Sequence, residues 1–119
     1  SQGEFETFYT SDVPLKEGVS HFWTIDYFKK NSKEITYREV TTLSKPTEWE
    51  SEEEGLIISL NGRRAERTVT TANTGRIMNG WGLDPKKDPK GPMNVKVYID
   101  GNLIKEFNFN VIENVKKNN

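Results

Sequence analysis

The sequence predicts an all-β fold, an antiparallel sandwich of about seven short strands. Three observations favour this class. Segments that alternate apolar and polar residues, or that are rich in Thr, Val, Ile and aromatic residues, recur along the 119-residue chain. Clusters of Gly, Pro, Asn and Asp separate these segments. No segment has the apolar spacing of an amphipathic helix. Several short strands divided by such turns are typical of a β-sandwich.

Each predicted strand rests on its own residues. The clearest is 21–28, where Trp23, Ile25 and Tyr27 share one face and the residues between them share the other. The others are apolar runs, alternating segments or segments rich in β-branched residues. In chain order the predicted strands are 3–9 (GEFETFY), 21–28 (HFWTIDYF), 34–43 (EITYREVTTL), 55–60 (GLIISL), 66–72 (ERTVTTA), 92–99 (PMNVKVYI) and 102–112 (NLIKEFNFNVI).

The last two strands form a predicted hairpin around Asp100-Gly101. A strict two-residue turn would pair odd positions with even ones and would set Glu106 and Asn108 on the buried face. A three-residue loop pairs odd positions with odd ones, which keeps the apolar residues of both strands on one face. We therefore predict the three-residue loop, closed by a bulge with Gly101 left-handed. Lys105 then falls on the buried face of the sheet, and we expect its ammonium to reach the margin of the sheet. The predicted buried face is Met93, Val95, Val97, Ile99, Leu103, Phe107, Phe109 and Val111.

Length and composition predict one domain, spanning 1–112, followed by a polar tail at 113–119. The chain has no cysteine, which excludes a disulfide scaffold, a thiolate metal site and a cysteine nucleophile. Its net charge of −1 gives no global attraction to nucleic acid, and three lysines at 86, 87 and 90 add only a small basic loop. No apolar run approaches the roughly 20 residues of a membrane-spanning helix.

The layout of the chain resembles a group of bacterial immunoglobulin-like domains. The residues that carry the resemblance are VPLKEG at 13–18, the W-x-L segment at 81–83, and GPMNVKVYIDGNLIKEFNFNV at 91–111. Together they look like an uncharacterised family called domain of unknown function 3859, over most of residues 3–112. The resemblance implies an immunoglobulin-like sandwich. It also implies an extracytoplasmic setting, in the periplasm or at the cell surface, with a leader that is not present in this chain. It brings no activity with it.

The stretch TGRIMNGWGLDPKKDPKGP, residues 74–92, raises the question of a phosphate-binding loop. Its glycines match neither the Walker loop nor the dinucleotide fingerprint, and no helix is predicted to follow. We expect a short strand through Ile77 and Met78, a turn at Asn79-Gly80, and then Trp81 directed into the sandwich with Leu83. The alternative is that Trp81 lies exposed among the glycines as a stacking platform.

Four further features are weighed as candidate sites. Trp49 lies in an acidic segment and either contacts a partner or caps the open end of the sandwich. The five glutamates between 48 and 54 lack the ligand spacing of a calcium loop and are interpreted as a solvated charge run. His21, the only histidine, has no predicted nucleophile beside it and is interpreted as structural or exposed. Asp26 is expected on the solvent face or at a sheet edge.

These observations predict a non-enzymatic binding or accessory module, exported or surface-associated, that uses loops at one end. Its partner is an unknown protein or glycan, with Trp49 and Trp81 as the possible contact residues. We expect no cofactor, no metal, no nucleic acid and no membrane span, and the oligomeric state is left open. One alternative is a carbohydrate-binding module that stacks sugars on these tryptophans. A second is a small enzyme or enzyme inhibitor, although no nucleophile, metal set or carboxylate pair stands out.

Overall fold

The computed structural model describes residues 12–16, 20–47 and 56–113 of the chain. These residues form eight strands and one turn of 3-10 helix, and they contain no α-helix. The predicted strand 3–9 lies outside the described residues. In chain order the elements are β1 (Asp12–Leu15), β2 (Ser20–Tyr27), β3 (Glu34–Leu43), β4 (Ile57–Ser59), η1 (Leu60–Gly62), β5 (Arg64–Ala72), β6 (Gly75–Gly82), β7 (Gly91–Ile99) and β8 (Asn102–Glu113).

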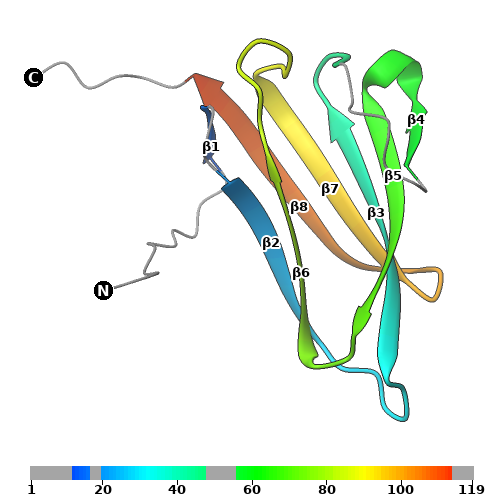
Figure 1. The fold of residues 1–119 in the computed structure, drawn as a ribbon. Helices are drawn as coiled ribbons and strands as arrows, with labels where there is room; N and C mark the ends of the chain where they lie inside the picture. Colours follow the sequence, from blue (N-terminus) through cyan, green and yellow to red (C-terminus); the bar gives the residue numbers. More distant parts are fainter. Residues whose placement is uncertain (1–11, 17–19, 48–55, 114–119) are drawn as a thin grey trace, which may run out of the picture.

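The strands form two sheets. The large sheet has the order β1-β8-β7-β3-β5-β4, and the small sheet is the antiparallel pair β2-β6. All pairs in the large sheet are antiparallel except β1 with β8, which run parallel. The β2–β6 pair lies over the β8–β7–β3 side of the large sheet, and β5 and β4 extend beyond it (Figure 1). The prediction of an all-β sandwich is therefore confirmed.

The core lies between the two sheets. One buried cluster joins apolar residues of β2 and β6 to residues of β3 and β7, with Phe107 and Phe109 of β8 packed against it. A second, smaller cluster lies nearer the ends of β3 and β8 and includes Val13, Leu43 and Val111. Trp23 and Ile25, which the sequence places on one face of 21–28, are buried, whereas Phe22, Asp26 and Phe28 on the other face are exposed. The alternation of side chains in β2 thus decides which face of the small sheet packs against the large sheet.

The last hairpin turns more tightly than the sequence predicts. Ile99 pairs with Asn102, so the turn contains only Asp100 and Gly101. Both have positive φ, 51° and 79°, as a type I′ turn requires. The predicted three-residue loop is therefore wrong, although Gly101 is left-handed as expected. Aspartate is among the few residues that tolerate this conformation, and the tight turn suits the natural twist of the two strands.

A β-bulge at Ile104 restores the predicted pairing beyond the turn. Val97 pairs with Lys105 but Tyr98 pairs with Leu103, which leaves Ile104 as the extra residue. From there on odd residues face odd residues, so Val95 pairs with Phe107. Two placements change because of the bulge. Leu103 is 50% exposed rather than buried, and Ile104 packs against the main core cluster in its place. The exposed Lys105 keeps its charge in solvent, as expected.

Strand β6 runs without interruption through Asn79-Gly80, where the sequence predicts a turn. Asn79 pairs with Trp23 and Gly80 with Phe22 in the middle of the small sheet. The glycine is needed for a different reason. A Cβ atom at position 80 would lie 2.9 Å from the backbone oxygen of His21 and 3.2 Å from Cβ of Phe22. Gly80 therefore allows two backbones to approach closely, and the prediction of a turn at this position is wrong.

The apolar run 55–60 forms a strand, as predicted, but at the edge of the large sheet. Strand β4 contains only Ile57, Ile58 and Ser59 and pairs with β5. It ends in η1, where Leu60 and Asn61 both have positive φ, 54° and 55°. The side chains of Ile57 and Leu60 are more than half exposed. This segment is therefore an apolar strand that does not contribute to the main core.

Candidate functional site

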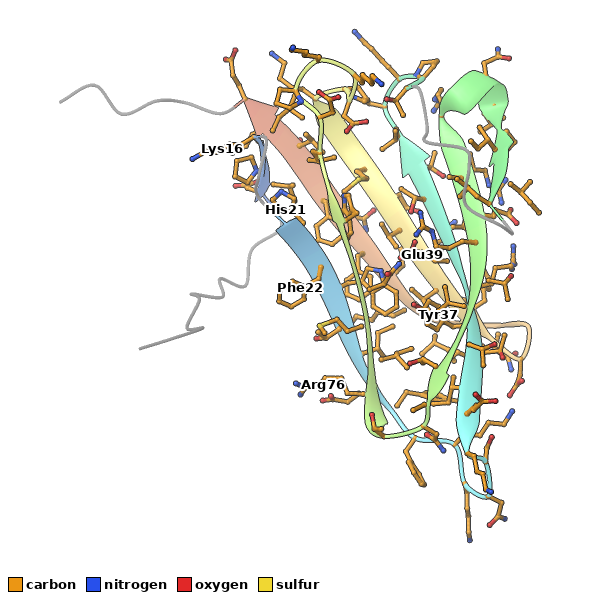
Figure 2. The ribbon with its side chains drawn as sticks, in the orientation of Figure 1. Lys16, His21, Phe22, Tyr37, Glu39 and Arg76 are labelled. Atoms are coloured by element: carbon orange, nitrogen blue, oxygen red, sulfur yellow. The ribbon has the colours of Figure 1, made fainter. Side chains whose placement is uncertain are left out.

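A buried carboxylate lies where the two sheets meet. Glu39 of β3 is 6% exposed and is the one charged side chain in the core of the described residues. Its Oε2 accepts hydrogen bonds from Trp23 Nε1 of β2 at 2.6 Å and from Asn79 Nδ2 of β6 at 3.0 Å. Its Oε1 lies 3.5 Å from Nε of Arg67 on β5. Figure 2 shows Glu39 and Tyr37 in the space between β6 and β3.

This arrangement favours a structural role for Glu39. Both carboxylate oxygens are occupied by donors, and the positive charge of Arg67 compensates the buried negative charge. The neighbouring Tyr37 is disfavoured as a phenolate base. Burial, followed by the negative charge of Glu39, raises the pKa of Tyr37 to about 12, so its phenol stays protonated at neutral pH. Nothing in the sequence singles out Glu39 as a site, although it lies on the same face of 34–43 as the buried Ile35 and Tyr37.

His21 lies at the start of β2, beside β1 (Figure 2). Its ring is half-buried, with its centroid 6.2 Å from that of Trp81. Burial lowers the pKa of His21 below its ordinary value of 6.5, and a hydrogen bond with the Pro14 backbone partly opposes the shift. The Nε2 atom is buried and has no hydrogen-bond partner within the described part of the chain. Asp26 is exposed on the other face and pairs with Arg76 at 2.9 Å, so these two titratable residues do not meet.

Trp81 lies half-buried between the two core clusters and packs against both. The edge of one ring meets the face of the other where Trp81 contacts Phe109, at a centroid distance of 5.7 Å. Leu83, two residues later, is buried in the second cluster. The ring of Trp81 is therefore already packed within the sandwich. Trp49 and the glutamate run at 48–54 lie outside the described residues.

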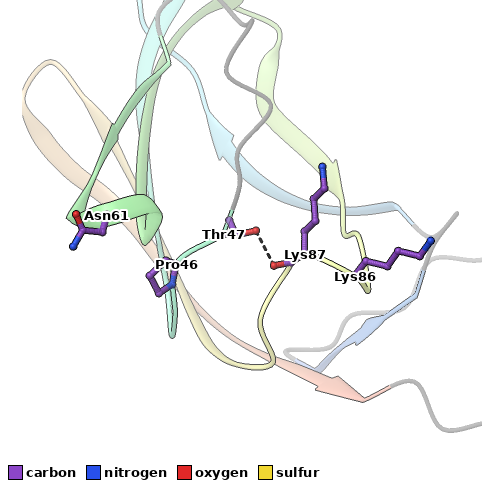
Figure 3. A pocket seen from close by; sticks show the side chains of 5 residues that line it. All are labelled: Pro46, Thr47, Asn61, Lys86 and Lys87. Atoms are coloured by element: carbon purple, nitrogen blue, oxygen red, sulfur yellow. Dashed lines mark hydrogen bonds between the residues drawn. The ribbon is translucent and has the colours of Figure 1, made fainter.

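An open depression lies at the end of the sandwich where β3 and β6 end and β7 begins. Figure 3 shows that its walls come from three connections. Pro46 and Thr47 follow β3, Asn61 belongs to η1, and Lys86 and Lys87 belong to the β6–β7 loop. The space they enclose is about 410 Å³. Residues far apart in the sequence thus meet around one concave surface.

Hydrogen bonds fix the lysine-bearing wall of this depression. The carbonyl of Asp84 accepts bonds from the backbone N–H groups of Lys87 and Asp88, at 3.0 and 2.8 Å. In return, Asp88 Oδ2 accepts the N–H of Asp84 at 2.7 Å, and Asp84 Oδ1 accepts the N–H of Lys86 at 2.9 Å. The hydroxyl of Thr47 lies 2.9 Å from both the Lys87 carbonyl and Asp88 Oδ1, which joins the two loops. The exposed Lys86 is therefore carried on a well-bonded turn.

The arrangement suits recognition by charge and hydrogen bonding. A lysine ammonium and the Asn61 amide line an open space, and such groups bind carboxylates, sulfates or hydroxyls, whereas the Thr47 hydroxyl is engaged by the β6–β7 loop. Among residues 12–16, 20–47 and 56–113, no group of three or more His, Asp or Glu side chains is placed to hold a metal ion. The same residues form no helix that could cross a membrane.

Comparison with known proteins gives a match to a family model. No curated protein and no solved structure is significantly similar to the chain. A family model described as the PM0630 beta sandwich domain matches residues 1–112, which is most of the chain. The match agrees with the two-layer arrangement of the strands. The chain belongs to the PM0630 beta sandwich domain family.

Proposed function

We propose that this protein is a non-enzymatic binding module that recognises its partner at the loop-bearing end of the sandwich. The depression between the β3–β4 connection, η1 and the β6–β7 loop is the observation that carries the proposal. It is concave, it carries side-chain donors from η1 and the β6–β7 loop, and its lysine-bearing wall is held by hydrogen bonds. Loops placed by a rigid scaffold are where binding residues concentrate. The partner is a protein or glycan with acidic groups that Lys86 contacts.

The immunoglobulin-like assignment is part of this proposal and is supported by the strand order. The neighbours β8-β7-β3 correspond to strands G, F and C of that fold, and the β2–β6 pair corresponds to strands B and E. An additional strand beside β3 is also found in variable-type domains. One difference is that the chain forms the outermost strand, β4, before it forms β5. Binding through loops at one end is common in domains of this architecture.

The non-enzymatic part is supported by the state of the buried titratable groups. Glu39 accepts two hydrogen bonds and forms an ion pair with Arg67, and Tyr37 keeps its proton. His21 and Asp26 lie on opposite faces of β2. An exported or surface-associated setting in bacteria is supported by the resemblance of residues 13–18, 81–83 and 91–111 to domains of that setting. A sugar-stacking role is less favoured for Trp81, because its ring packs against both core clusters.

The proposal is tested by nuclear magnetic resonance titration of the ¹⁵N-labelled chain with two probes, a hexaglutamate peptide and a sulfated oligosaccharide. We expect at least one probe to shift the amide signals of Thr47, Asn61 and Lys86. Lys86→Glu should weaken that binding, because it places a carboxylate opposite an anionic probe. Lys30→Glu is the matched control, since Lys30 is also exposed but lies in the β2–β3 loop at the other end. Shifts confined to other surfaces, or none with either probe, would refute the proposal.

A further inference from the structure

Strand β1 is a short edge strand whose attachment to the large sheet rests on few residues. Among the described residues it pairs only with β8, in a parallel register that covers four residues. Val13 lies directly opposite Val111, is 3% exposed and belongs to the second core cluster. No residue of β1 belongs to the main core cluster. The main core therefore does not require β1 to be docked.

The ring of His21 joins β1 to the small sheet. It lies beside β1 (Figure 2) and forms a hydrogen bond with the Pro14 backbone. Proline has no backbone N–H, so the carbonyl oxygen of Pro14 accepts this bond and the imidazole donates it. The Nε2 atom is buried and has no partner in the described part of the chain, so the donor is Nδ1–H. The neutral ring thus leaves the lone pair of Nε2 buried without a donor.

The surroundings of the His21 ring do not suit a second proton. Trp81 lies directly opposite His21 in the β2–β6 pair, and the two ring centroids are 6.2 Å apart. The charged residues on and next to β1, β2, β6 and β8 are Asp12, Lys16, Asp26, Arg76, Asp84, Lys105, Glu106 and Glu113. None of them contributes to the pKa of His21, which is shifted by burial and by the Pro14 hydrogen bond. A proton on Nε2 would therefore place an uncompensated charge, and a donor without an acceptor, at a buried position.

We propose that His21 is a pH-sensitive switch: protonation of its Nε2 atom releases β1 from β8 while the rest of the sandwich stays folded. When β1 leaves, water reaches the ring and hydrates the imidazolium, which removes the cost of the buried charge. Release also uncovers Val111 and the backbone edge of β8 that β1 now pairs with. The switch does not depend on the proposed binding site at the loop-bearing end.

The direction of the switch follows from proton linkage. Burial lowers the pKa of His21 while β1 is docked, and release returns the pKa toward its ordinary value of 6.5. The released form therefore binds the proton more readily than the docked form. Docking of β1 is strongest above pH 6.5 and weakens as the pH falls toward the docked-state pKa. Because one proton is involved, the ratio of released to docked β1 rises by at most about tenfold per pH unit.

Nuclear magnetic resonance of the full isotope-labelled chain between pH 7.5 and 4.5 tests the switch. His21 is the only histidine, so the imidazole signals report its protonation directly. We expect the signals of Val13 and Leu15 to move to unfolded-chain positions together with protonation of the ring. The signals of Val95 and Val97, in the main core, should stay at their folded positions. Signals of β1 that stay folded after the ring has titrated, or unfolding of all strands together, would overturn the proposal.

Three variants separate His21 from the carboxylates near β1. His21→Gln keeps an N–H group for the Pro14 carbonyl but takes up no proton, so β1 should stay docked down to pH 4.5. Asp12→Asn and Glu113→Gln each remove a carboxylate at the β1–β8 pair and should release β1 like the parent chain. Release that persists in His21→Gln, or that is lost in Asp12→Asn or Glu113→Gln, would contradict the switch. If His21→Gln does not dock β1 at pH 7.5, the parent chain decides, because release that does not coincide with ring protonation refutes the proposal.

Discussion

The indole N–H of Trp23 donates a 2.6 Å hydrogen bond to the carboxylate of Glu39, across the interface between the two sheets. The small sheet supplies the donor and the large sheet supplies the acceptor. Asn79, directly opposite Trp23 in the β2–β6 pair, donates to the same oxygen. The buried charge therefore fixes the position of the small sheet over β3, in addition to the apolar core.

We expect Glu39→Gln to lower the free energy of unfolding by about 1–3 kcal/mol, because the new amide cannot accept from all the donors that now converge there. Trp23→Phe should cost a similar amount, since it removes the indole donor. The double variant should lose less than the sum of the two, because the residues share one bond. Urea titration measures all three. The exposed Glu34→Gln is the control and should stay within about 0.5 kcal/mol of the parent.

The bulge at Ile104 predicts opposite responses from two adjacent residues. Ile104→Ala should destabilise the protein by about 1–3 kcal/mol, because Ile104 packs on the main core cluster. Leu103→Ala should stay within about 0.5 kcal/mol, because Leu103 is half exposed. Denaturant titration of the two variants is the measurement. If Leu103→Ala were the more costly change, the three-residue loop would be correct and the bulge would not exist.

Phe107 provides a matched test further along β8. Its ring stacks on those of Trp23 and Phe109, at centroid distances of 5.8 and 6.0 Å. Phe107→Ala should therefore cost about 3 kcal/mol. The exposed neighbours Glu106 and Asn108 accept hydrogen bonds from Asn94 on the outer face, so their alanine variants should change stability by about 0.5 kcal/mol or less. The reverse ranking in thermal or chemical unfolding would show that the other face of β8 is buried.

Gly80 should not tolerate a side chain. Gly80→Ala brings a Cβ atom within 2.9 Å of the His21 carbonyl oxygen, so β2 and β6 must separate, at a cost of about 1–3 kcal/mol. Calorimetric melting of this variant should show the loss. Met78→Ala, two residues earlier on the same strand and 60% exposed, should melt close to the parent protein. Equal melting temperatures for Gly80→Ala and the parent would indicate a turn, rather than a paired strand, at this position.

His21 should make stability depend on pH. Burial lowers its pKa in the folded protein below 6.5, so the unfolded chain binds the proton more readily. The contribution of His21 is then fully present above pH 6.5 and is lost as the pH falls toward the folded-state pKa. Comparing urea unfolding of the parent and His21→Gln between pH 7.5 and 4.5 isolates this effect from the carboxylates. An equal pH dependence of both proteins would contradict it.

The sequence predicts the parts of the fold that depend on local pattern. Alternation in 92–99 correctly assigns the buried face, and alternation in 21–28 correctly groups Trp23 with Ile25, because the side chains of a strand can lie on only two faces. It does not locate the bulge, because the twist of the hairpin decides whether Ile104 or Leu103 packs inward. It also cannot distinguish a glycine that turns the chain from one that allows close approach, and Gly80 is the second kind. A turn and a close approach of two backbones both require glycine, so the residue type alone does not separate them.

The candidate site is less predictable than the fold. The loop-bearing end was expected to carry the contacts, but the grouping of Thr47, Asn61 and Lys86 depends on three connections that only the folded chain brings together. Glu39 was missed because a lone glutamate in a strand gives no signal of its donors. Those donors come from β2, β5 and β6, between 16 and 40 residues away along the chain.

The most direct test of this account compares Glu39→Gln with Lys86→Glu in both stability and binding. The buried carboxylate of Glu39 stabilises the fold, whereas Lys86 at the loop-bearing end is proposed to contact the partner. Glu39→Gln should therefore lower the free energy of unfolding while the folded protein keeps its affinity for the anionic probe that binds the parent. Lys86→Glu should leave the free energy of unfolding within about 0.5 kcal/mol and weaken that affinity. If Glu39→Gln instead kept full stability and abolished probe binding, Glu39 would be a functional carboxylate and the account would be wrong.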